Sequence, residues 1–415
     1  MMRAAGIALV LALGAPRTVA VGQGPQALPR IKAPADLRVV VGSAPYEVAV
    51  GGATPWMLLD AWGRTHARGT DASWKIERRN RRLRALAPDG RTTTAWSEEA
   101  FAVVPQAKGD PVTFAGKRYR GELRYVATDT AVLVVNVLPL EDYLRGVVPL
   151  EIGARQPTES AAIEAQAIAA RSYTVVRALE GVLLPWDLTA RATDQVYGGM
   201  DGESTLGDAA VRATAGVVLA YGGQPVRAPY HSTCGGATAA PAEVWQGGVD
   251  AWLRSVSDRM PGSDRAWCDI SPRFRWERTL DERTILDGIA RQAAGRRVGR
   301  VRMARVASLT PSGRVGALTF ETDAGSVTLT GNDIRFALRG FGGEILNSTY
   351  FSVEPVVGPD GRLAQLVLRG RGNGHGVGMC QWGAIGRARA GYAAAEILAA
   401  YYPAASLARL QDTRR

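Results

Sequence analysis

The chain has 415 residues, of which 46% are hydrophobic and 21% are charged. These values are typical of a globular protein with two or three domains and a sizeable core. The formal net charge of +11 indicates an acidic partner, such as nucleic acid, anionic lipid or an acidic wall polymer. No basic helix with interleaved aromatic residues occurs, so we expect no nucleic-acid binding. The basic run from Arg78 to Arg84 alternates like the solvated face of a strand, with a polymer-binding stripe as the alternative.

The N-terminus is typical of an export signal. Met1-Met2-Arg3 precedes an apolar run from Ala4 to Ala15, and small residues follow. At about 12 residues this run is short for a membrane span, although an uncleaved anchor is the alternative. No second segment is long and apolar enough to span. We therefore expect export to the periplasm, cell envelope or medium, with membrane contact only through an uncleaved N-terminal segment. Such a compartment permits disulfides.

The rest of the chain predicts an α+β fold. We assign residues 1–35 to the signal and a linker, 36–125 to a β-rich N-terminal module and 126–405 to a mixed α/β core. Short β-rich runs separated by Gly, Pro or Asp turns fill the region from Leu37 to Leu140. A helix and a β-meander with PSG and DAG turns form an insertion at about 280–335.

Three segments are predicted to be helical, one of which is the helix of this insertion. The first begins with Thr158 as N-cap and ends at Gly181. It has one face of small residues, namely Ile163, Ala167, Ala170 and Thr174. The second runs from Leu280 to about Ala294. The third, from Gln381 to Tyr402, is a pair of short helices broken near Gly391 and stopped by Pro403.

Glu151 is the candidate catalytic residue. It follows a strand-like run, and helical spacing begins about eight residues later. We expect it at a strand–helix corner, where apolar walls would partly desolvate its carboxyl. Desolvation raises the pKa of a carboxyl toward the range where it both gives and takes a proton near neutral pH.

Three polar, glycine-rich clusters in the second half of the chain jointly indicate one binding site. They are TDQVYGG at 193–199, YHSTCGG at 230–236 and GRGNGHGVGMCQWGAIG at 370–386. In the third cluster glycine recurs at every second residue, which does not fit the dinucleotide fingerprint. A Ser–His–Asp site using Ser232 lacks the nucleophile-elbow pattern.

The cysteines allow several interpretations. In an exported protein we expect a Cys234–Cys268 disulfide, while a zinc site or free buried thiols remain alternatives. Three cysteines with His231 and His375 could bind zinc, but their spacing matches no common zinc site. The remaining histidine, His66, lies in a turn-like WGRTHARGT and is predicted to be on the surface.

At these same residues the chain resembles the stage II sporulation protein D and amidase enhancer family (SpoIID/LytB). The matching stretches run in order from about residue 137 to 403. They are PLEDYLRGVVPLE, AQAIAARSYTVV, DQVYGG, YHSTCGGAT, GNDIRFALRG with STYFSV, and NGHGVGMCQWGA with AEILAAYYP. Residues before about 100 carry no such resemblance.

The resemblance implies a peptidoglycan lytic transglycosylase. Such enzymes cleave the β-1,4 bond between N-acetylmuramic acid and N-acetylglucosamine and leave a 1,6-anhydro end, so a single protein carboxyl suffices. The family's catalytic glutamate falls on Glu151 and its helix arginine on Arg171. Substrate contacts are implied for matching side chains, each with a loop-holding role as the alternative: Gln166, Tyr173, Gln195, Tyr197, His231, Ser232 and His375. No cofactor is implied.

Two departures from the family pattern bear on the site. Glu164 stands where relatives often have a lysine, and we expect it either to pair with Arg171, to raise the pKa of Glu151, or to be solvated. In addition, Glu151 is followed by Ile152-Gly153, where many members of the family have Met-Pro. The competing functions are a wall-binding amidase enhancer without catalysis and a zinc hydrolase using His231 and His375.

Overall fold

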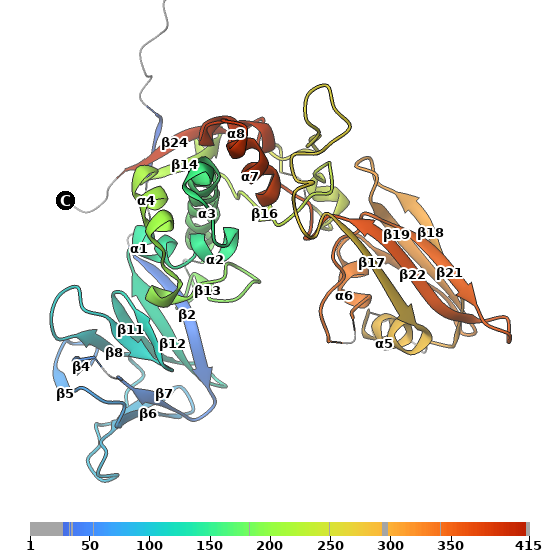
Figure 1. Ribbon diagram of the computed structural model, residues 1–415. Helices are drawn as coiled ribbons and strands as arrows, with labels where there is room; N and C mark the ends of the chain where they lie inside the picture. Colours follow the sequence, from blue (N-terminus) through green and yellow to red (C-terminus); the bar gives the residue numbers. More distant parts are fainter. Residues whose placement is uncertain are drawn as a thin grey trace, which may run out of the picture.

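The computed structural model describes residues 28–32, 34, 36–52, 54–181, 183–248, 250–292, 298–340 and 342–411. The fold is α+β, as predicted, with a β-rich N-terminal part, a helical centre and an elongated second core (Figure 1). The predicted export signal lies outside the described residues. Among the helices that are described, none has the length and apolar character needed to cross a bilayer.

The β-rich part is built on a seven-stranded sheet with the order β13-β2-β12-β11-β8-β4-β5, flanked by the sheets β3-β6-β7 and β9-β10. Alternate side chains of its strands, such as Leu37 and Val39 in β2, are fully buried. The strands are β2 (Leu37–Ala44), β3 (Glu47–Val50), β4 (Trp56–Leu59), β5 (Thr65–Gly69), β6 (Trp74–Arg79), β7 (Arg82–Leu86), β8 (Phe101–Pro105), β9 (Val112–Phe114), β10 (Lys117–Tyr119), β11 (Glu122–Ala127), β12 (Val132–Leu138) and β13 (Leu188–Thr189).

One buried amide links this sheet to the functional region. Asn136 in β12 is fully buried, and its side-chain nitrogen donates to the carbonyls of Arg120 and Glu122 at 2.8 and 3.0 Å. Its Oδ1 accepts the hydroxyl of Tyr197 at 2.8 Å. The sheet therefore fixes the loop that carries Tyr197, because a buried amide strongly favours having its partners in place.

The helical centre is organised around α3 (Ser160–Glu180), which lies between the other helices (Figure 1). Its predicted small-residue face is buried, and the helix ends before Gly181 as expected. The surrounding helices are α1 (Leu140–Arg145), α2 (Val148–Ile152), α4 (Thr205–Ala213), α7 (Gln381–Arg389) and α8 (Ala394–Tyr401), with 3₁₀ turns at Pro157–Glu159 (η1) and Gly199–Gly202 (η2). The predicted break at Gly391 is confirmed, since this glycine has a φ of 89° between α7 and α8.

Two small sheets bring distant segments of the chain together. The order β1-β24-β14-β15 places the first described strand beside the last one. β16 and β23 pair in parallel, so that Tyr230 faces Met379 and His231 faces Cys380. The second and third polar clusters therefore lie side by side. The strands are β1 (Arg30–Lys32), β14 (Val217–Tyr221), β15 (Gln224–Pro225), β16 (Tyr230–His231), β23 (Met379–Cys380) and β24 (Ser406–Gln411).

The second core has its own hydrophobic cluster, which runs from Leu280 to Leu368. It contains the predicted helix and the predicted meander, and it extends beyond the predicted limits of 280–335 to include the sheet β17-β22-β21. Its elements are β17 (Arg275–Asp281), α5 (Glu282–Gln292), β18 (Val301–Leu309), β19 (Val315–Thr322), β20 (Gly325–Thr330), α6 (Asp333–Ala337), β21 (Phe351–Val357) and β22 (Leu363–Arg371). A further 3₁₀ turn, η3, spans Pro241–Glu243.

Two local predictions are wrong. Thr158 does not cap α3, because it lies inside η1, which leads directly into the helix. His66 is not a free surface residue in a turn. It lies in β5, is partly buried, and its Nε2 is 2.9 Å from Oδ2 of Asp60.

Candidate functional site

Glu151 lies in the last turn of the short helix α2. Pro149 stands near the start of this helix, and Gly153, with a φ of 77°, ends it. The sequence predicted Glu151 at a corner between a strand and a helix that begins about eight residues later. The structure does begin α3 at Ser160, but two short helices that were not predicted, α1 and α2, lie between β12 and α3, and Glu151 is in the second of them. The single-turn length of α2 is below what periodicity can reveal.

The carboxyl of Glu151 is partly buried against the first polar cluster. Its Oε1 accepts the backbone N–H of Val196 at 2.8 Å. Burial raises the pKa of Glu151 above its ordinary value, and the single Val196 hydrogen bond opposes this only in part. A carboxyl of this kind keeps more of its protonated form near neutral pH than a solvated glutamate does.

The third polar cluster reaches Glu151 through Gln381. The Gln381 side-chain amide donates to the backbone carbonyl of Glu151 at 3.0 Å and to Oε1 of Gln166 at 3.2 Å. Gln166 is fully buried in α3, and its Nε2 has no hydrogen-bond partner among the described residues. α2, α3 and the start of α7 therefore meet at Glu151, as the clustering of the motifs predicted.

Arg171 does not contact Glu151 in the described structure. Its guanidinium is fully buried and forms a two-pronged ion pair with Glu141 of α1, at 2.8 and 2.7 Å. The remaining donors reach Thr214 and the carbonyls of Val211 and Val217. These contacts join α1, α3, α4 and β14.

Of the three alternatives for Glu164, the pair with Arg171 is not formed in the described structure. Glu164 is partly buried on α3, and burial raises the pKa of its own carboxyl. We conclude that Arg171, the family's helix arginine, positions the helices around the site through Glu141 and makes no contact with the Glu151 carboxyl in the described structure.

Gln195 and Tyr197 are internal rather than exposed to a ligand. The Gln195 Oε1 accepts the hydroxyls of Tyr143 and Thr174 at 3.1 and 2.7 Å, and its Nε2 donates to the hydroxyl of Tyr230 and to the carbonyl of Ala170. Tyr197 is 5% exposed and donates to Asn136. Both side chains hold the loop that presents the Val196 N–H. For these two residues the structure therefore favours the loop-holding role over the substrate contact that the resemblance implied.

Tyr173 and Ser232 remain partly exposed. Tyr173 lies on α3, with the guanidinium carbon of Arg227 6.0 Å from its ring centroid. The hydroxyl of Ser232 lies 3.3 Å from that of Thr233. These two side chains keep an accessible surface, so they remain candidates for contact with a ligand.

The two histidines are neutral and locked in place. His231 donates through Nδ1 to the carbonyl of Val377, and its buried Nε2 has no partner among the described residues. His375 accepts the Val377 N–H at Nδ1 and donates through Nε2 to the carbonyl of Tyr230. Burial lowers the pKa of His375 to about 3 and that of His231 well below its ordinary range. Neither ring can serve as an acid near neutral pH.

The predicted Cys234–Cys268 disulfide is not formed. The two sulfurs lie 3.5 Å apart, and all three cysteines are free and buried. Among the described residues, the only group that could hold a metal ion consists of the three cysteines and Asp258. His231 and His375 do not belong to it, so the geometry gives no support to a zinc hydrolase built on those two side chains.

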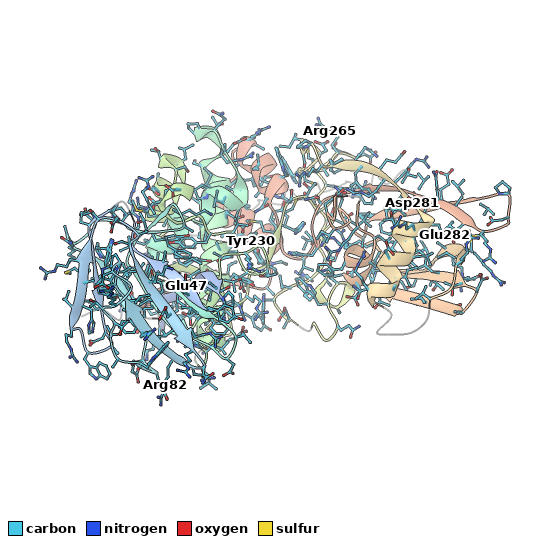
Figure 2. The ribbon with its side chains drawn as sticks, turned by 90° about the horizontal axis from the view of Figure 1, so that it is seen from below. Glu47, Arg82, Tyr230, Arg265, Asp281 and Glu282 are labelled. Carbon is cyan, nitrogen blue, oxygen red and sulfur yellow. The ribbon has the colours of Figure 1, made fainter. Side chains whose placement is uncertain are left out.

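Several residues of this region were missed from the sequence. Tyr230 and Gln381 lie inside the quoted motifs and could have been selected as the polar side chains of those loops. Figure 2 shows Tyr230 near the middle of the molecule, between the β-rich part and the second core. Glu141 also lies in a quoted motif. Asn136 and Asp258 have no local sequence signal.

Two larger hollows of the described surface lie away from Glu151. One, of about 690 Å³, is lined by residues of β17, β21 and β22 such as Trp276 and Arg371. The other, of about 720 Å³, lies between η3 and the meander and includes Trp245 and Phe336. Glu151 lines neither of these two hollows.

Comparison with known proteins finds relatives of the part of the chain that contains Glu151. The family described as stage II sporulation protein matches residues 128–221, which contain α1 to α4 and Glu151. This part of the chain is therefore a SpoIID-like domain, in agreement with its similarity to the SpoIID/LytB family. A domain of unknown function matches residues 263–378, which cover the second core.

Three curated relatives show similar levels of identity. An uncharacterized protein of Brachyspira hyodysenteriae is 29% identical over 294 residues, which is 71% of this chain and 73% of that protein. The stage II sporulation protein D of Bacillus subtilis is 29% identical over 298 residues, 66% of this chain and 75% of that protein. The amidase enhancer of Bacillus subtilis is 29% identical over 301 residues, covering 64% of this chain but only 40% of the relative.

The buried ion pair gives a first prediction. Glu141→Gln leaves the buried charge of Arg171 without its counter-ion, and we expect the free energy of unfolding to fall by about 2 kcal/mol. The matched control is Asp142→Asn, a neighbouring carboxyl 3.7 Å from Arg145, for which we expect a change below about 0.5 kcal/mol. Urea unfolding measures both. Equal effects of the two substitutions would contradict the structural role assigned to Arg171.

The partial burial of Glu151 gives a second prediction, on pH dependence. The raised pKa means that the charged carboxylate is less favourable in the folded chain than in the unfolded chain. Glu151→Gln should therefore raise Tm at pH 7. That gain should vanish as the pH falls below the ordinary value of 4.5, where the carboxyl is neutral in both states.

The control for this experiment is Glu98→Gln, whose carboxyl is 70% exposed, and it should leave Tm unchanged at both pH values. Thermal unfolding followed by circular dichroism makes the measurement. A gain for Glu151→Gln that persists unchanged at pH 4 would argue against a desolvated carboxyl.

Proposed function

We propose that this protein is an exported lytic transglycosylase that cleaves the β-1,4 bond between N-acetylmuramic acid and N-acetylglucosamine in peptidoglycan strands. The observation that carries the proposal is the state of Glu151. It is a partly buried carboxyl with a raised pKa, held by a backbone N–H and placed where three family motifs meet.

The proposed chemistry needs only this one carboxyl. Protonated Glu151 gives its proton to the glycosidic oxygen as the bond from that oxygen to the anomeric carbon breaks. The 6-hydroxyl oxygen of the same muramic acid residue bonds to the anomeric carbon, and its proton passes to the Glu151 carboxylate. The products are a free sugar hydroxyl and a 1,6-anhydro end, and no water is consumed. The enzyme ends in its starting protonation state.

The surroundings of Glu151 fit this cycle. A carboxyl with an ordinary pKa would be almost fully ionised at pH 7 and could not begin as the acid. The described structure places no arginine or lysine side chain in contact with Glu151, so no cation holds its pKa down. The Val196 N–H instead fixes one carboxyl oxygen, which leaves the other for the glycosidic oxygen.

The net charge of +11 supports an anionic polymer as the substrate. Partly exposed aromatic and hydroxyl groups near the motifs, such as Tyr173 and Ser232, are of the kind that grip sugar rings. The locked histidines and Gln195 serve this surface by holding its loops. The N-terminal apolar run supports export to the compartment where peptidoglycan lies.

A second candidate function is favoured by two specific observations. One relative is named amidase enhancer, and Arg171 is engaged with Glu141 instead of assisting Glu151. On this alternative the protein binds wall glycan and stimulates a partner amidase without cleaving the strand itself.

The third prediction separates the two functions. Glu151→Gln should lower the release of 1,6-anhydro products from purified glycan strands by at least about 100-fold, because it removes the proton donor. The variant should still fold and bind the strands. Mass spectrometry of the digest measures the products, and co-sedimentation with the glycan measures binding.

Glu164→Gln is the matched control for this loss of activity. It removes another partly buried carboxyl whose pKa is raised by burial, from α3, and we expect activity close to that of the natural protein. Undiminished release by Glu151→Gln would eliminate the mechanism. If the natural protein releases no product while both it and Glu151→Gln stimulate an amidase, the enhancer function is correct.

A further inference from the structure

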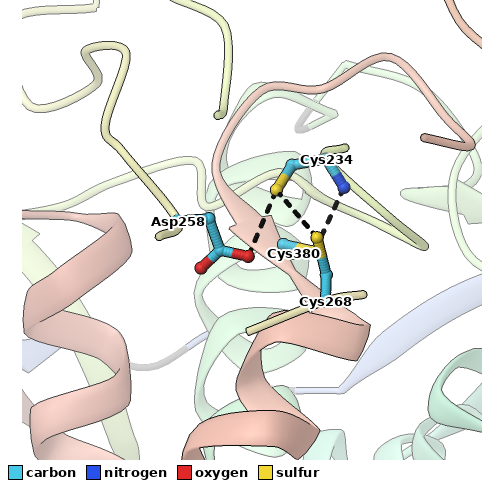
Figure 3. A group of neighbouring side chains, drawn as sticks. All are labelled: Cys234, Asp258, Cys268 and Cys380. Atoms are coloured by element: carbon cyan, nitrogen blue, oxygen red, sulfur yellow. Dashed lines mark hydrogen bonds between the residues drawn. The ribbon is translucent and has the colours of Figure 1, made fainter. Parts of the chain in front are cut away.

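Four buried side chains converge in the described structure outside the contacts of Glu151. They are Cys234 after β16, Asp258 and Cys268 in the long connection before β17, and Cys380 at the start of α7. Figure 3 shows their polar ends directed toward one another. Their potential ligand atoms all lie within 4.8 Å of one another, and each residue is fully buried.

We infer that Cys234, Cys268, Cys380 and Asp258 form a closed structural site for a thiophilic divalent cation, with zinc as the expected ion. Three sulfurs and one carboxylate oxygen are a donor set that zinc accepts. The inference concerns a part of the molecule that the proposed glycan chemistry does not use, so the two can fail independently.

The spacing of the donors fits tetrahedral coordination. With zinc–sulfur bonds of about 2.3 Å, neighbouring sulfurs in a tetrahedron lie about 3.8 Å apart. The Cys234 and Cys268 sulfurs are 3.5 Å apart, and the Cys234 sulfur is 3.3 Å from Oδ2 of Asp258. A disulfide would use only two of the four groups, and it would leave one thiol and a carboxyl buried against it.

Backbone N–H groups donate hydrogen bonds to two of the cysteine sulfurs, as they commonly do to metal-binding thiolates. Cys380 Sγ accepts the N–H groups of Cys234 and Gly383 at 3.1 and 3.3 Å, and Cys234 Sγ accepts that of Gly236 at 3.4 Å. Cys380 is also the N-cap of the nine-residue helix α7, where the helix dipole favours a negative charge. Such contacts stabilise the deprotonated sulfur that binds metal.

Asp258 is oriented by groups behind it. Its Oδ1 accepts the hydroxyl of Tyr401 at 2.7 Å and the guanidinium of Arg387 at 3.1 Å. Its Oδ2 is thereby directed at the sulfurs. This is the outer-shell arrangement that fixes a ligating carboxylate, and Arg387 offsets part of the negative charge of the four donors.

The site is closed, so its role is structural. Four protein donors fill a tetrahedral shell and leave no position for water or substrate. The ion would fasten three segments that are far apart in the sequence. One of them leads directly into Gln381, whose amide supports the backbone at Glu151. Binding free energy at such a site adds to folding free energy.

The fourth prediction is that the full-length protein, purified without added metal or chelator, contains one zinc per chain by plasma mass spectrometry. Thiol titration in denaturant with chelator should detect three free thiols. Replacement of zinc by Co²⁺ should give the intense visible bands of a tetrahedral site and the near-ultraviolet bands of thiolate ligation. These measurements use the natural protein and do not depend on whether a variant folds.

Variants then test the ligands themselves. Cys268→Ser and Asp258→Asn should each weaken zinc binding by about 100-fold or more in competition with a chromogenic chelator. Asp269→Asn is the matched control, because its carboxyl lies next to Cys268 in sequence but pairs with Arg265, and it should retain the ion.

Two results would overturn the site. One is a single free thiol in the denatured protein, which means that a disulfide has formed. The other is three free thiols in a protein that contains no metal and takes up neither Zn²⁺ nor Co²⁺.

Discussion

The parallel pairing of β16 with β23 is the contact on which the functional region depends. It joins Tyr230 to Met379 and His231 to Cys380 across almost 150 residues of sequence. Because of it, the loop that carries Cys234 and the loop that leads into α7 share one place. The same pairing sets Gln381 beside α2 and brings two of the sulfurs of the proposed metal site together. If the two strands separated, the surroundings of Glu151 and the cysteine cluster would be lost together.

Several buried polar residues, both inside and outside the family motifs, hold this frame. Arg171, Gln195 and Asn136 are fully buried, and each makes several hydrogen bonds between elements that are distant in the chain. A buried polar group is costly unless it has partners, so each of these side chains enforces one arrangement of its neighbours. Glu151 differs from them because it is only partly buried and, among the described residues, its carboxyl accepts a single hydrogen bond. A carboxyl that lacks its full set of hydrogen-bond partners is what one expects of a group that exchanges a proton with a ligand.

Local sequence signals predicted the longer elements well. The small-residue face of α3, its end at Gly181, the meander of β18 to β20 and the break at Gly391 are all as expected, because they depend on periodicity and turn chemistry within the segment itself. Short elements were not predicted, because the same local signals need more residues than these elements contain. α2 has only five residues, and β16 and β23 have two each, which is too short for any pattern to emerge. The start of α3 was misplaced because a 3₁₀ turn precedes it.

The sequence by itself determined the α+β class and the likeness to the SpoIID/LytB family, and it predicted Glu151 as the candidate and the clustering of the polar motif loops, since these are properties of residue type and order. Tertiary structure alone decided the partners. It paired Arg171 with Glu141 instead of Glu151, buried Gln195 and Tyr197 inside the protein, and brought Asp258 to three cysteines. A charged or polar side chain can form its hydrogen bonds or ion pairs with any complementary group that folding brings near. Its partner is therefore set by long-range packing, which a local pattern does not encode.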